Sequence, residues 1–389
     1  MNKPIPQGYK DSPLGIIPKE WEVKKIIDFA PLQRGFDLPT DKVVKGKFPV
    51  VYSNGILNYH YEYKAKGPGV VTGRSGTIGK VTFVESDYWP HNTSLWVTDF
   101  KGNNPKYVFY VYRYMDLSKF ASGSGVPTLN RNDVHISKVA VPSIEEQNAI
   151  VKLLELWDTA IEKQSELIEK LTLRKRALMQ QLLTGKKRLP GFSGEWKSHC
   201  MNDHFQLVLD KNDGKGHLPM TISARNGLIS QKEKFDRIVA GNSLDNYTLL
   251  KKGDFAYNKG NSNLYEMGCV YRLIEESAVV PFVYICFRVV DNTCCAFYEH
   301  FFINHGLDAQ LKRIITSGAR SDGLLNVSSD DFMKLRIPYP DIEEQKAIAD
   351  ILDNANFEIE LAKEKLANLQ SQKRGLMQQL LTGNKRIKG

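Results

Sequence analysis

The sequence predicts an α+β protein in which two globular domains stand in tandem, separated by two long antiparallel coiled-coil helices. Three observations predict this fold: a segment that occurs twice, an apolar seam along both copies, and short β-branched and aromatic runs between them. The 389 residues suffice for two or three domains of ordinary size. A hydrophobic content of 42% with 10% aromatic residues is typical of a folded chain and excludes the disordered and fibrous classes.

The repeat is the first element of this prediction. Ile144 to Arg188 match Ile342 to Arg386 without a gap at an offset of 198, and 23 of the 45 aligned positions are identical. Chance would give about three identities. The first copy is followed by LPGFSGEW, and the similar SPLGIIPKEW stands near the start of the chain, so the repeat is cyclic. A chain of two such units can fold with pseudo-twofold symmetry and present two similar surfaces to one target.

Both copies carry the start and stop signals of one long helix. Ser143 and Asp341 each precede a glutamate (Glu146 and Glu344) by three residues, which is the spacing of a capping box. A Thr-Gly pair ends each run, where a helix C-terminus favours glycine. The roughly forty residues between these limits would form a rod of about 60 Å.

Along each helix, apolar residues recur at alternating steps of four and three, which indicates a coiled-coil seam. The simplest pairing sets the two helices antiparallel and side by side; the alternative is that each packs separately on its own domain. Lys175 and Lys373 interrupt the two seams at the same place, where they either snorkel out or mark a local opening. The predicted seam and subunit-docking residues are Ile150, Leu154, Trp157, Ile161, Leu171, Leu178, Leu182, Ile348, Leu352, Ile359, Leu366, Leu369, Leu376 and Leu380.

The two variable segments, roughly 20–140 and 197–340, have the pattern of strands and turns with occasional helices. The whole chain carries 53 Lys and Arg against 44 Asp and Glu, a net charge of +9. Residues up to 140 carry 19 basic and 12 acidic side chains, hence +7, whereas residues 197–340 carry 17 and 16, hence +1. The basic excess is therefore concentrated in the first segment. It permits a nucleic-acid partner, although a solvated mixed-charge face explains any single lysine as well.

The sequence contains no catalytic constellation. No phosphate-binding GxxxxGK[ST] loop, no HExxH pair and no amino-methyltransferase Pro-Pro-aromatic signature occurs. The glycine-rich GRSGTIG at 73–79 lacks the spacing of a dinucleotide fingerprint and is predicted to be a turn. The five cysteines form no CxxC pair, so neither a disulfide framework nor a zinc site is expected. We therefore expect no catalytic residue and no metal site. Since no run of eighteen apolar residues occurs, no membrane span is expected, and the cysteines suit a reducing cytoplasm.

Taken together, these motifs resemble the DNA specificity subunit of type I restriction-modification systems. Each variable segment is followed by a proline turn, a helix start that reads IEEQxAI and a helix end that reads MQQLLTGxKR. Further stretches look like parts of that family's target-recognition domain: GRSGTIG (73–79), PHNTSLWV (90–97) and GSGVPTLNRNDVHISKVAVP (123–142). Weaker counterparts in the second unit are YNKGNSN (257–263) and SGARSDGLLNVSSDDFMKLRIPYP (317–340). The resemblance covers essentially the whole chain.

The resemblance implies a non-catalytic protein with target-recognition domain 1 at 1–142, a first spacer helix at 143–189, target-recognition domain 2 at 190–340 and a second spacer helix at 341–389. It implies that each domain reads one half of a split, asymmetric DNA site and that the helices fix the spacing. The implied partners are double-stranded DNA, two modification (methyltransferase) subunits and restriction (helicase-nuclease) subunits. S-adenosyl-methionine, ATP and Mg would be bound by those subunits, which would carry out adenine methylation and ATP-dependent cleavage.

Base reading needs side chains whose donors and acceptors match base edges, such as Arg for guanine and Asn or Gln for adenine. Phosphate contact or plain loop solvation is the alternative for each candidate. The predicted DNA-binding residues are Arg34, Asn54, Arg74, Ser75, Thr77, His91, Asn92, Lys211, Arg225, Lys259, Asn261, Ser262 and Arg320.

Two other functions stay open at this point. One is a stand-alone or fused methyltransferase or restriction enzyme, which the missing motifs and the lack of spare chain disfavour. The other is a coiled-coil scaffold without a DNA role. Methyl transfer by the purified protein alone would identify the first. Neighbouring genes for a methyltransferase and a helicase-nuclease would argue against the second.

Overall fold

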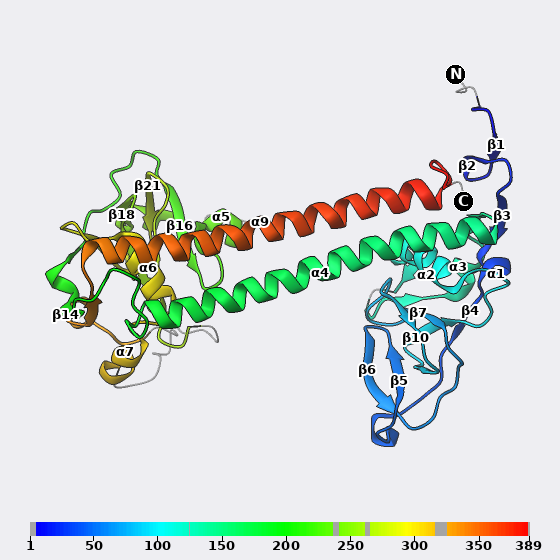
Figure 1. Cartoon of the computed structure of the whole chain (residues 1–389), viewed down its shortest axis with the longest axis horizontal. Coiled ribbons are helices and arrows are strands. Elements are labelled where there is room, and N and C mark those ends of the chain that lie inside the picture. The colour runs from blue at the N-terminus through cyan, green and yellow to red at the C-terminus, as the bar shows by residue number, and fades with distance from the viewer. Residues whose placement is uncertain (1–4, 124, 236–240, 261–264, 316–324, 388–389) are drawn as a thin grey trace. The chain divides into compact units, whose positions relative to one another are not determined.

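The computed structural model describes residues 5–123, 125–235, 241–260, 265–315 and 325–387 (Figure 1). The chain forms two compact units. Unit 1 comprises Met1–Glu166 together with Glu364–Gly389, and unit 2 comprises Leu167–Lys363. The division points fall at nearly equivalent positions of the two repeated segments.

Unit 1 is built on a four-stranded antiparallel sheet of order β4-β10-β7-β8, with a second sheet of order β6-β5-β9. Helix α2 lies against β7 and β8, and strand β7 is buried along its whole length. The side chain of Asn104 caps α2 by accepting the amide of Lys106 at 2.8 Å. The elements of unit 1 before the long helix are β1 (Tyr9–Ser12), β2 (Gly15–Pro18), β3 (Glu22–Lys25), α1 (Ile26–Phe29), β4 (Leu32–Arg34), η1 (Thr40–Lys42), β5 (Phe48–Tyr52), β6 (Gly55–His60), β7 (Gly69–Gly73), β8 (Val81–Val84), β9 (Trp89–Pro90), β10 (Ser94–Val97), α2 (Pro105–Tyr114), η2 (Leu117–Phe120), β11 (Ala121–Ser122), β12 (Thr128–Leu129), α3 (Arg131–His135) and β13 (Lys138–Val141).

Unit 2 repeats the plan of unit 1. Its sheet of order β15-β22-β19-β20 corresponds strand for strand to β4-β10-β7-β8, and α6 lies against β20 as α2 lies against β8. Its second sheet differs and has the order β17-β16-β21-β18. The elements are β14 (Lys197–Cys200), η3 (Met201–Asp203), β15 (Phe205–Leu207), β16 (Leu218–Ser223), β17 (Gly227–Ser230), α5 (Gln231–Phe235), η4 (Gly241–Asn246), β18 (Thr248–Lys251), β19 (Phe255–Asn258), β20 (Cys269–Arg272), β21 (Ser277–Val280), β22 (Ile285–Val289), α6 (Cys295–Ile303), α7 (Asp308–Ile314), α8 (Ser329–Met333) and β23 (Arg336–Tyr339). The predicted α+β fold with two domains in tandem is confirmed.

The repeated segments form the long helices α4 (Ile144–Leu182) and α9 (Ile342–Leu381), green and red in Figure 1. In each unit the start of one helix packs against the end of the other, so the paired segments are antiparallel. The shared core of unit 1 contains Ile150, Val151, Leu154, Met377, Leu380 and Leu381, and that of unit 2 contains Met179, Leu182, Leu183, Ile348, Ala349 and Leu352. All fourteen predicted seam positions are buried or half-buried.

The two seam lysines differ in their burial. Lys373 is only 4% exposed, pairs with Asp158, and places its Nζ 5.1 Å from the centre of the Tyr110 ring. Burial lowers the pKa of Lys373, while the hydrogen bond with Asp158 opposes that shift. Lys175 is half-buried, and burial lowers its pKa too. Lys373 therefore does not snorkel to the solvent, because its ammonium group pairs with the Asp158 carboxylate beside the seam.

Among the described residues, no helix combines the length and the apolar character that a membrane span requires.

Candidate nucleic-acid interface

Four connections of unit 1 meet at one end of its main sheet. They are residues 34–38, which begin at the last residue of β4, the β5–β6 turn at 53–54, the β7–β8 connection at 74–80 and residues 91–93 before β10. Together they are called the loop cluster. The antiparallel order β4-β10-β7-β8 brings them together, because the ends of β4 and β7 lie beside the starts of β10 and β8.

Thr93 ties three of these connections to one another. Its carbonyl accepts the amides of Arg74 and Ser75 at 2.9 and 3.2 Å. Its Oγ1 accepts the amide of Ser53 at 3.3 Å. The fourth connection joins through a backbone bridge between Phe36 and His91. Main-chain hydrogen bonds and the Thr93 side chain therefore hold the four connections of the loop cluster together.

Gly73 marks the closest backbone approach inside the loop cluster. A Cβ at this position would overlap the carbonyl oxygen of Thr77 and lie 2.7 Å from that of Ser53. Only glycine lets the β7–β8 connection fold back so tightly against the β5–β6 turn. The glycine-rich run at 73–79, predicted to be a turn, thus sets the shape of the loop cluster.

His91 is held in place by its neighbours. Its ring lies 4.2 Å, centre to centre, from the ring of Tyr52, and its Nδ1 is 2.9 Å from Oγ1 of Thr93. Nε2 of His91 is 3.3 Å from the carbonyl oxygen of Leu38. Burial lowers the pKa of His91, which favours the neutral imidazole at neutral pH.

Asp37 organises two further candidates. Its carboxylate accepts Arg34 at 3.3 Å and also accepts the side-chain amide of Asn92. A carboxylate between two donors fixes their direction, and it can itself accept a hydrogen bond from an exposed base edge. The sequence prediction missed Asp37 because it looked for cationic and amide side chains.

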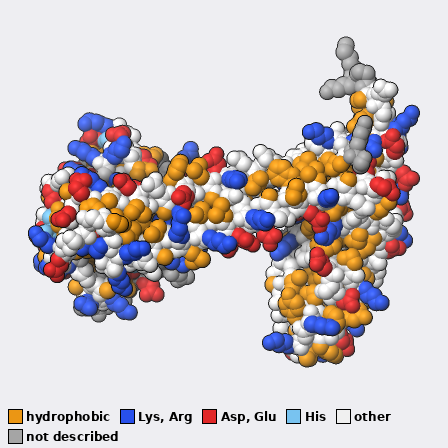
Figure 2. Space-filling model, viewed as in Figure 1, with side chains coloured by type: hydrophobic (Ala, Val, Ile, Leu, Met, Phe, Trp, Pro, Cys, Tyr) orange, Lys and Arg blue, Asp and Glu red, His pale blue; other side chains and the backbone are white. Residues whose placement is uncertain are grey.

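All seven residues predicted for unit 1 lie in the loop cluster. Arg34, Asn54 and Thr77 are exposed, whereas the other four are half-buried. The neighbouring strand β6 adds an apolar margin, since Leu57 and Tyr59 are 58% and 52% exposed. Figure 2 shows apolar side chains gathered over this part of unit 1.

In unit 2, Lys259 occupies the position that Arg74 has in unit 1. Each follows the corresponding strand, β19 or β7, and each carbonyl accepts an amide from the closing segment of its domain: Leu129 to Arg74 at 2.8 Å and Leu325 to Lys259 at 2.9 Å. The other predicted residues are more scattered. Lys211 is bridged to Thr248 at the start of β18, and Arg225 is exposed in the β16–β17 turn. The remaining candidates lie outside the described residues: Asn261, Ser262 and Arg320.

In each unit a tryptophan and an arginine donate hydrogen bonds to one buried glutamate, an arrangement called the clasp. Its residues are Trp21, Glu146 and Arg386 in unit 1 and Trp196, Glu344 and Arg188 in unit 2. Glu146 accepts the indole of Trp21 at 3.0 Å and Nε of Arg386 at 2.7 Å. The pattern of unit 2 is the same: the Glu344 carboxylate accepts the indole of Trp196 at 2.8 Å and two hydrogen bonds from the Arg188 guanidinium, both at 2.7 Å.

The predicted capping box is only half present in the first helix. Oγ of Ser143 accepts the amide of Glu146 at 3.4 Å, whereas the Glu146 carboxylate serves the clasp.

The next residue of the repeat ties the long helix to its domain. Oε1 of Gln147 accepts the amide of Asn104 at 2.9 Å, and Oε1 of Gln345 accepts the amide of Cys294 at 3.0 Å. These amides stand directly before α2 and α6, so the two helices occupy equivalent positions.

Comparison with known proteins decides the family. The type I restriction modification DNA specificity domain matches residues 18–173 and 225–371, which is well over half of the chain. The chain belongs to this family. A putative MjaX specificity subunit of a type I restriction enzyme from Methanocaldococcus jannaschii is 22% identical to it over 98% of this chain and 97% of that protein. The MjaIX specificity subunit of the same organism is 26% identical, with 42% of this chain and 45% of that protein covered.

Solved structures agree on the fold of this specificity-family chain. The crystal structure of a type I restriction-modification S subunit from M. genitalium matches with a TM-score of 0.55 at 12% identity, covering 93% of this chain and 96% of that one. A chain from a structural study of complex assembly and conformational transition of the type I R-M system gives a TM-score of 0.58 at 13% identity, covering 95% and 99%.

Proposed function

We propose that this chain reads a split, asymmetric DNA site, with one recognition domain for each half-site, as the specificity subunit of a type I restriction-modification complex. One observation carries the proposal. The two units share a sheet order and a clasp, whereas the side chains in their loops differ. Two domains with a common scaffold and different loops would read two different short sequences.

The loop cluster supplies the chemistry that base reading needs. Its arginines offer paired donors suited to guanine, and Asn54 and Asn92 offer the donor and acceptor pair suited to adenine. Lys259 and Arg225 would serve the second half-site.

The long helices would set the unread spacing. A helix of 39 residues, the length of α4, rises by about 60 Å. Half-sites one helical turn apart, about 34 Å, face the same side of the duplex, and this spacing lies within that length.

Protein partners would use the duplicated features. Two similar helix surfaces and clasps suit two copies of one modification subunit, and restriction subunits would join that assembly. The proposal assigns S-adenosyl-methionine, ATP and Mg to these partners and assigns no catalytic step to this chain.

A reconstitution experiment tests the proposal. The purified chain, the purified modification subunits and their mixture are each incubated with unmodified host DNA and labelled S-adenosyl-methionine. Sequence-specific methyl transfer by the mixture alone is the expected result. Transfer by the chain alone would show an enzyme, and specific transfer by the modification subunits without the chain would show that the chain is not the reader.

A further inference from the structure

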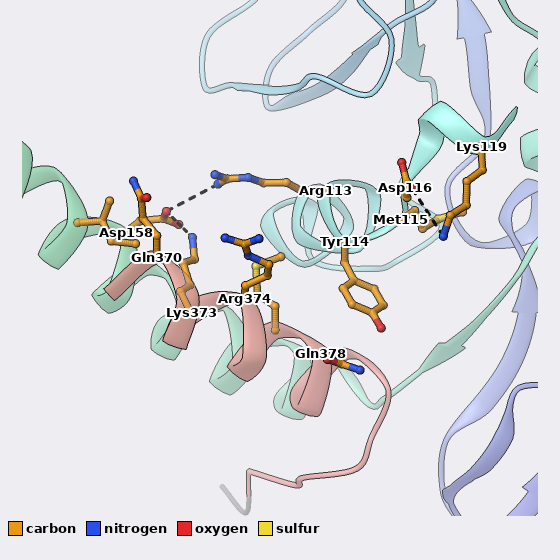
Figure 3. Close-up of a pocket in the computed structure, with 12 residues that line it drawn as sticks. Arg113, Tyr114, Met115, Asp116, Lys119, Asp158, Gln370, Lys373, Arg374 and Gln378 are labelled. Carbon is orange, nitrogen blue, oxygen red and sulfur yellow. Dashed lines mark hydrogen bonds and ion pairs between the residues drawn. The ribbon is translucent and has the colours of Figure 1, made fainter. Parts of the chain in front are cut away.

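Unit 1 contains a pocket beside the loop cluster that nothing above explains. Its volume is about 830 Å³, and it is lined by the end of α2, by η2 and by the paired segments of α4 and α9. Figure 3 shows its charged side chains: Arg113, Lys119, Lys373 and Arg374 are cationic, and Asp116 and Asp158 are anionic. Cations therefore outnumber carboxylates by two.

Arg374 is the cation of this pocket that lies near neither carboxylate. Asp158 is engaged by Lys373 and lies 3.7 Å from Arg113, while Asp116 lies 3.6 Å from Lys119. Arg374 is exposed, lines the same pocket as Arg113 (Figure 3) and, within the described ranges, forms no ion pair. Two guanidinium groups that line one pocket, of which only Arg113 lies near a carboxylate, favour an anionic ligand with several oxygen acceptors.

The pocket adjoins the loop cluster. The η2 helix follows α2 directly, and the backbone amide of Ser118 in η2 lies 3.8 Å from where a Cβ on Gly79 would stand. The nearby β12 strand is bridged to the loop cluster between Thr128 and Ser75. A duplex held by the loop cluster would therefore carry its sugar-phosphate backbone close to the pocket.

The alternative ligand is an acidic surface of a modification subunit. The differences between the two repeated units argue against this alternative. A partner that docks on both units would need the site in both. The residue before α2 and the residue before α6 each donate an amide to the equivalent glutamine, Gln147 or Gln345, so the two helices can be aligned from their starts. In that alignment Arg113 of α2 corresponds to Ile303 of α6. Arg374 has an identical counterpart in Arg176, but the second guanidinium is absent from that aligned position. A pocket with paired arginines in one unit suits an asymmetric ligand.

We propose that this pocket, through Arg113 and Arg374, binds backbone phosphates of the DNA next to the half-site read by unit 1. This inference rests on the proposed function and adds a phosphate anchor outside the base-reading loops. Such contacts set the register of the protein on DNA and add affinity that does not depend on base sequence.

The test uses the full chain assembled with its modification subunits and a fluorescent duplex that contains the sequence that the complex methylates (the cognate site). Arg113→Gln and Arg374→Gln are each expected to weaken binding equally for cognate and scrambled duplexes. Each is expected to make the plot of log affinity against log salt shallower by about 0.9. Arg374→Lys should restore part of the loss, because lysine still binds phosphate as a point charge. Lys152→Gln, which removes an exposed charge of α4 outside the pocket, is the matched control and should leave the salt plot unchanged.

Neutral methylphosphonates placed one at a time in the unread DNA next to that half-site complete the test. A methylphosphonate at one or two of these DNA positions should lower the affinity of the wild-type complex. The same substitutions should not lower the affinity of the complex that carries Arg374→Gln. Equal losses for both proteins, or failed assembly with DNA affinity intact, would overturn the phosphate anchor. A wild-type complex that does not prefer its cognate duplex would instead refute the proposed function itself.

Discussion

The indole Nε1 of Trp196 donates a hydrogen bond of 2.8 Å to the carboxylate of Glu344, a buried residue. Arg188, which follows the end of α4, binds the same carboxylate. The clasp therefore joins the first turn of one repeated helix to the residues just beyond the other. This contact explains why IEEQ and LTGxKR recur together: each motif supplies one half of a clasp.

Removing the indole donor should destabilise unit 2. Trp196→Phe keeps the aromatic ring and leaves the buried Glu344 carboxylate with one donor fewer, which should cost about 1–3 kcal/mol of unfolding free energy. Urea unfolding of the full chain measures this cost. Trp21→Phe is the matched variant in unit 1, because its indole donates to Glu146 at 3.0 Å. If neither variant shifts the midpoint, the tryptophans act by packing alone.

Acidification should weaken unit 2 through His300. Its ring is buried, its Nε2 lies 2.7 Å from Asp353, and burial lowers its pKa below 6.5. Between the lowered pKa and 6.5 the unfolded chain binds a proton that the folded chain does not, so stability is lost as the pH falls below about 6.5. His300→Gln should reduce the difference in urea midpoint between pH 7.5 and pH 5.5. Because burial also lowers the pKa of His91 and His135, part of the dependence should persist in the variant. An unchanged difference would remove His300 from this account.

The loop cluster should not tolerate a side chain at its tightest point. Gly73→Ala places a methyl group against the carbonyl oxygen of Thr77, so the β7–β8 connection must move. We expect site-specific methylation by the reconstituted complex to be lost while the chain still assembles with its partners. Gly125→Ala is the control, because a Cβ there meets no atom within 4 Å. Full activity of the Gly73 variant would mean that the shape of this loop does not matter for reading.

Arg74 is a proposed reading residue whose backbone is bonded on both sides. Its amide donates to Thr93 and its carbonyl accepts from Leu129, so only its side chain is free to change partners. Arg74→Ala should weaken binding of the cognate duplex, by about 1–3 kcal/mol if the guanidinium contacts a guanine, and leave assembly intact. Titration of the complex with cognate and singly substituted duplexes separates base reading from phosphate contact. Unchanged affinity for every duplex would remove Arg74 from the interface.

The repeat and its seam were sufficient to predict the long helices and the duplicated plan. Seam positions such as Ile150 are buried between the paired helices and are therefore apolar, and they recur every 3.5 residues. Their burial can thus be predicted from the spacing of apolar residues along the sequence. The partners of Glu146 and Lys373 could not be predicted in the same way. Trp21 and Arg386 are 125 and 240 residues away from Glu146, and no local pattern records that contact.

The loop candidates of unit 1 lie together, but the contacts between them could not be predicted from the sequence. Arg34 and Asn92 were chosen for their donors, yet their common acceptor Asp37 was missed, because a carboxylate in a DNA-facing loop is disfavoured by charge alone. Lys211 and Arg225 were chosen from local clusters, and the structure places them on separate connections of unit 2.

The central claim is that the two units read two different half-sites of one DNA sequence. Sequencing the modified adenines of the host genome, with and without the gene for this chain, tests it most directly. The account predicts one asymmetric motif of two short parts with a fixed unread gap, present only when the gene is present. A motif that persists without the gene, or that is continuous or palindromic, would contradict the account.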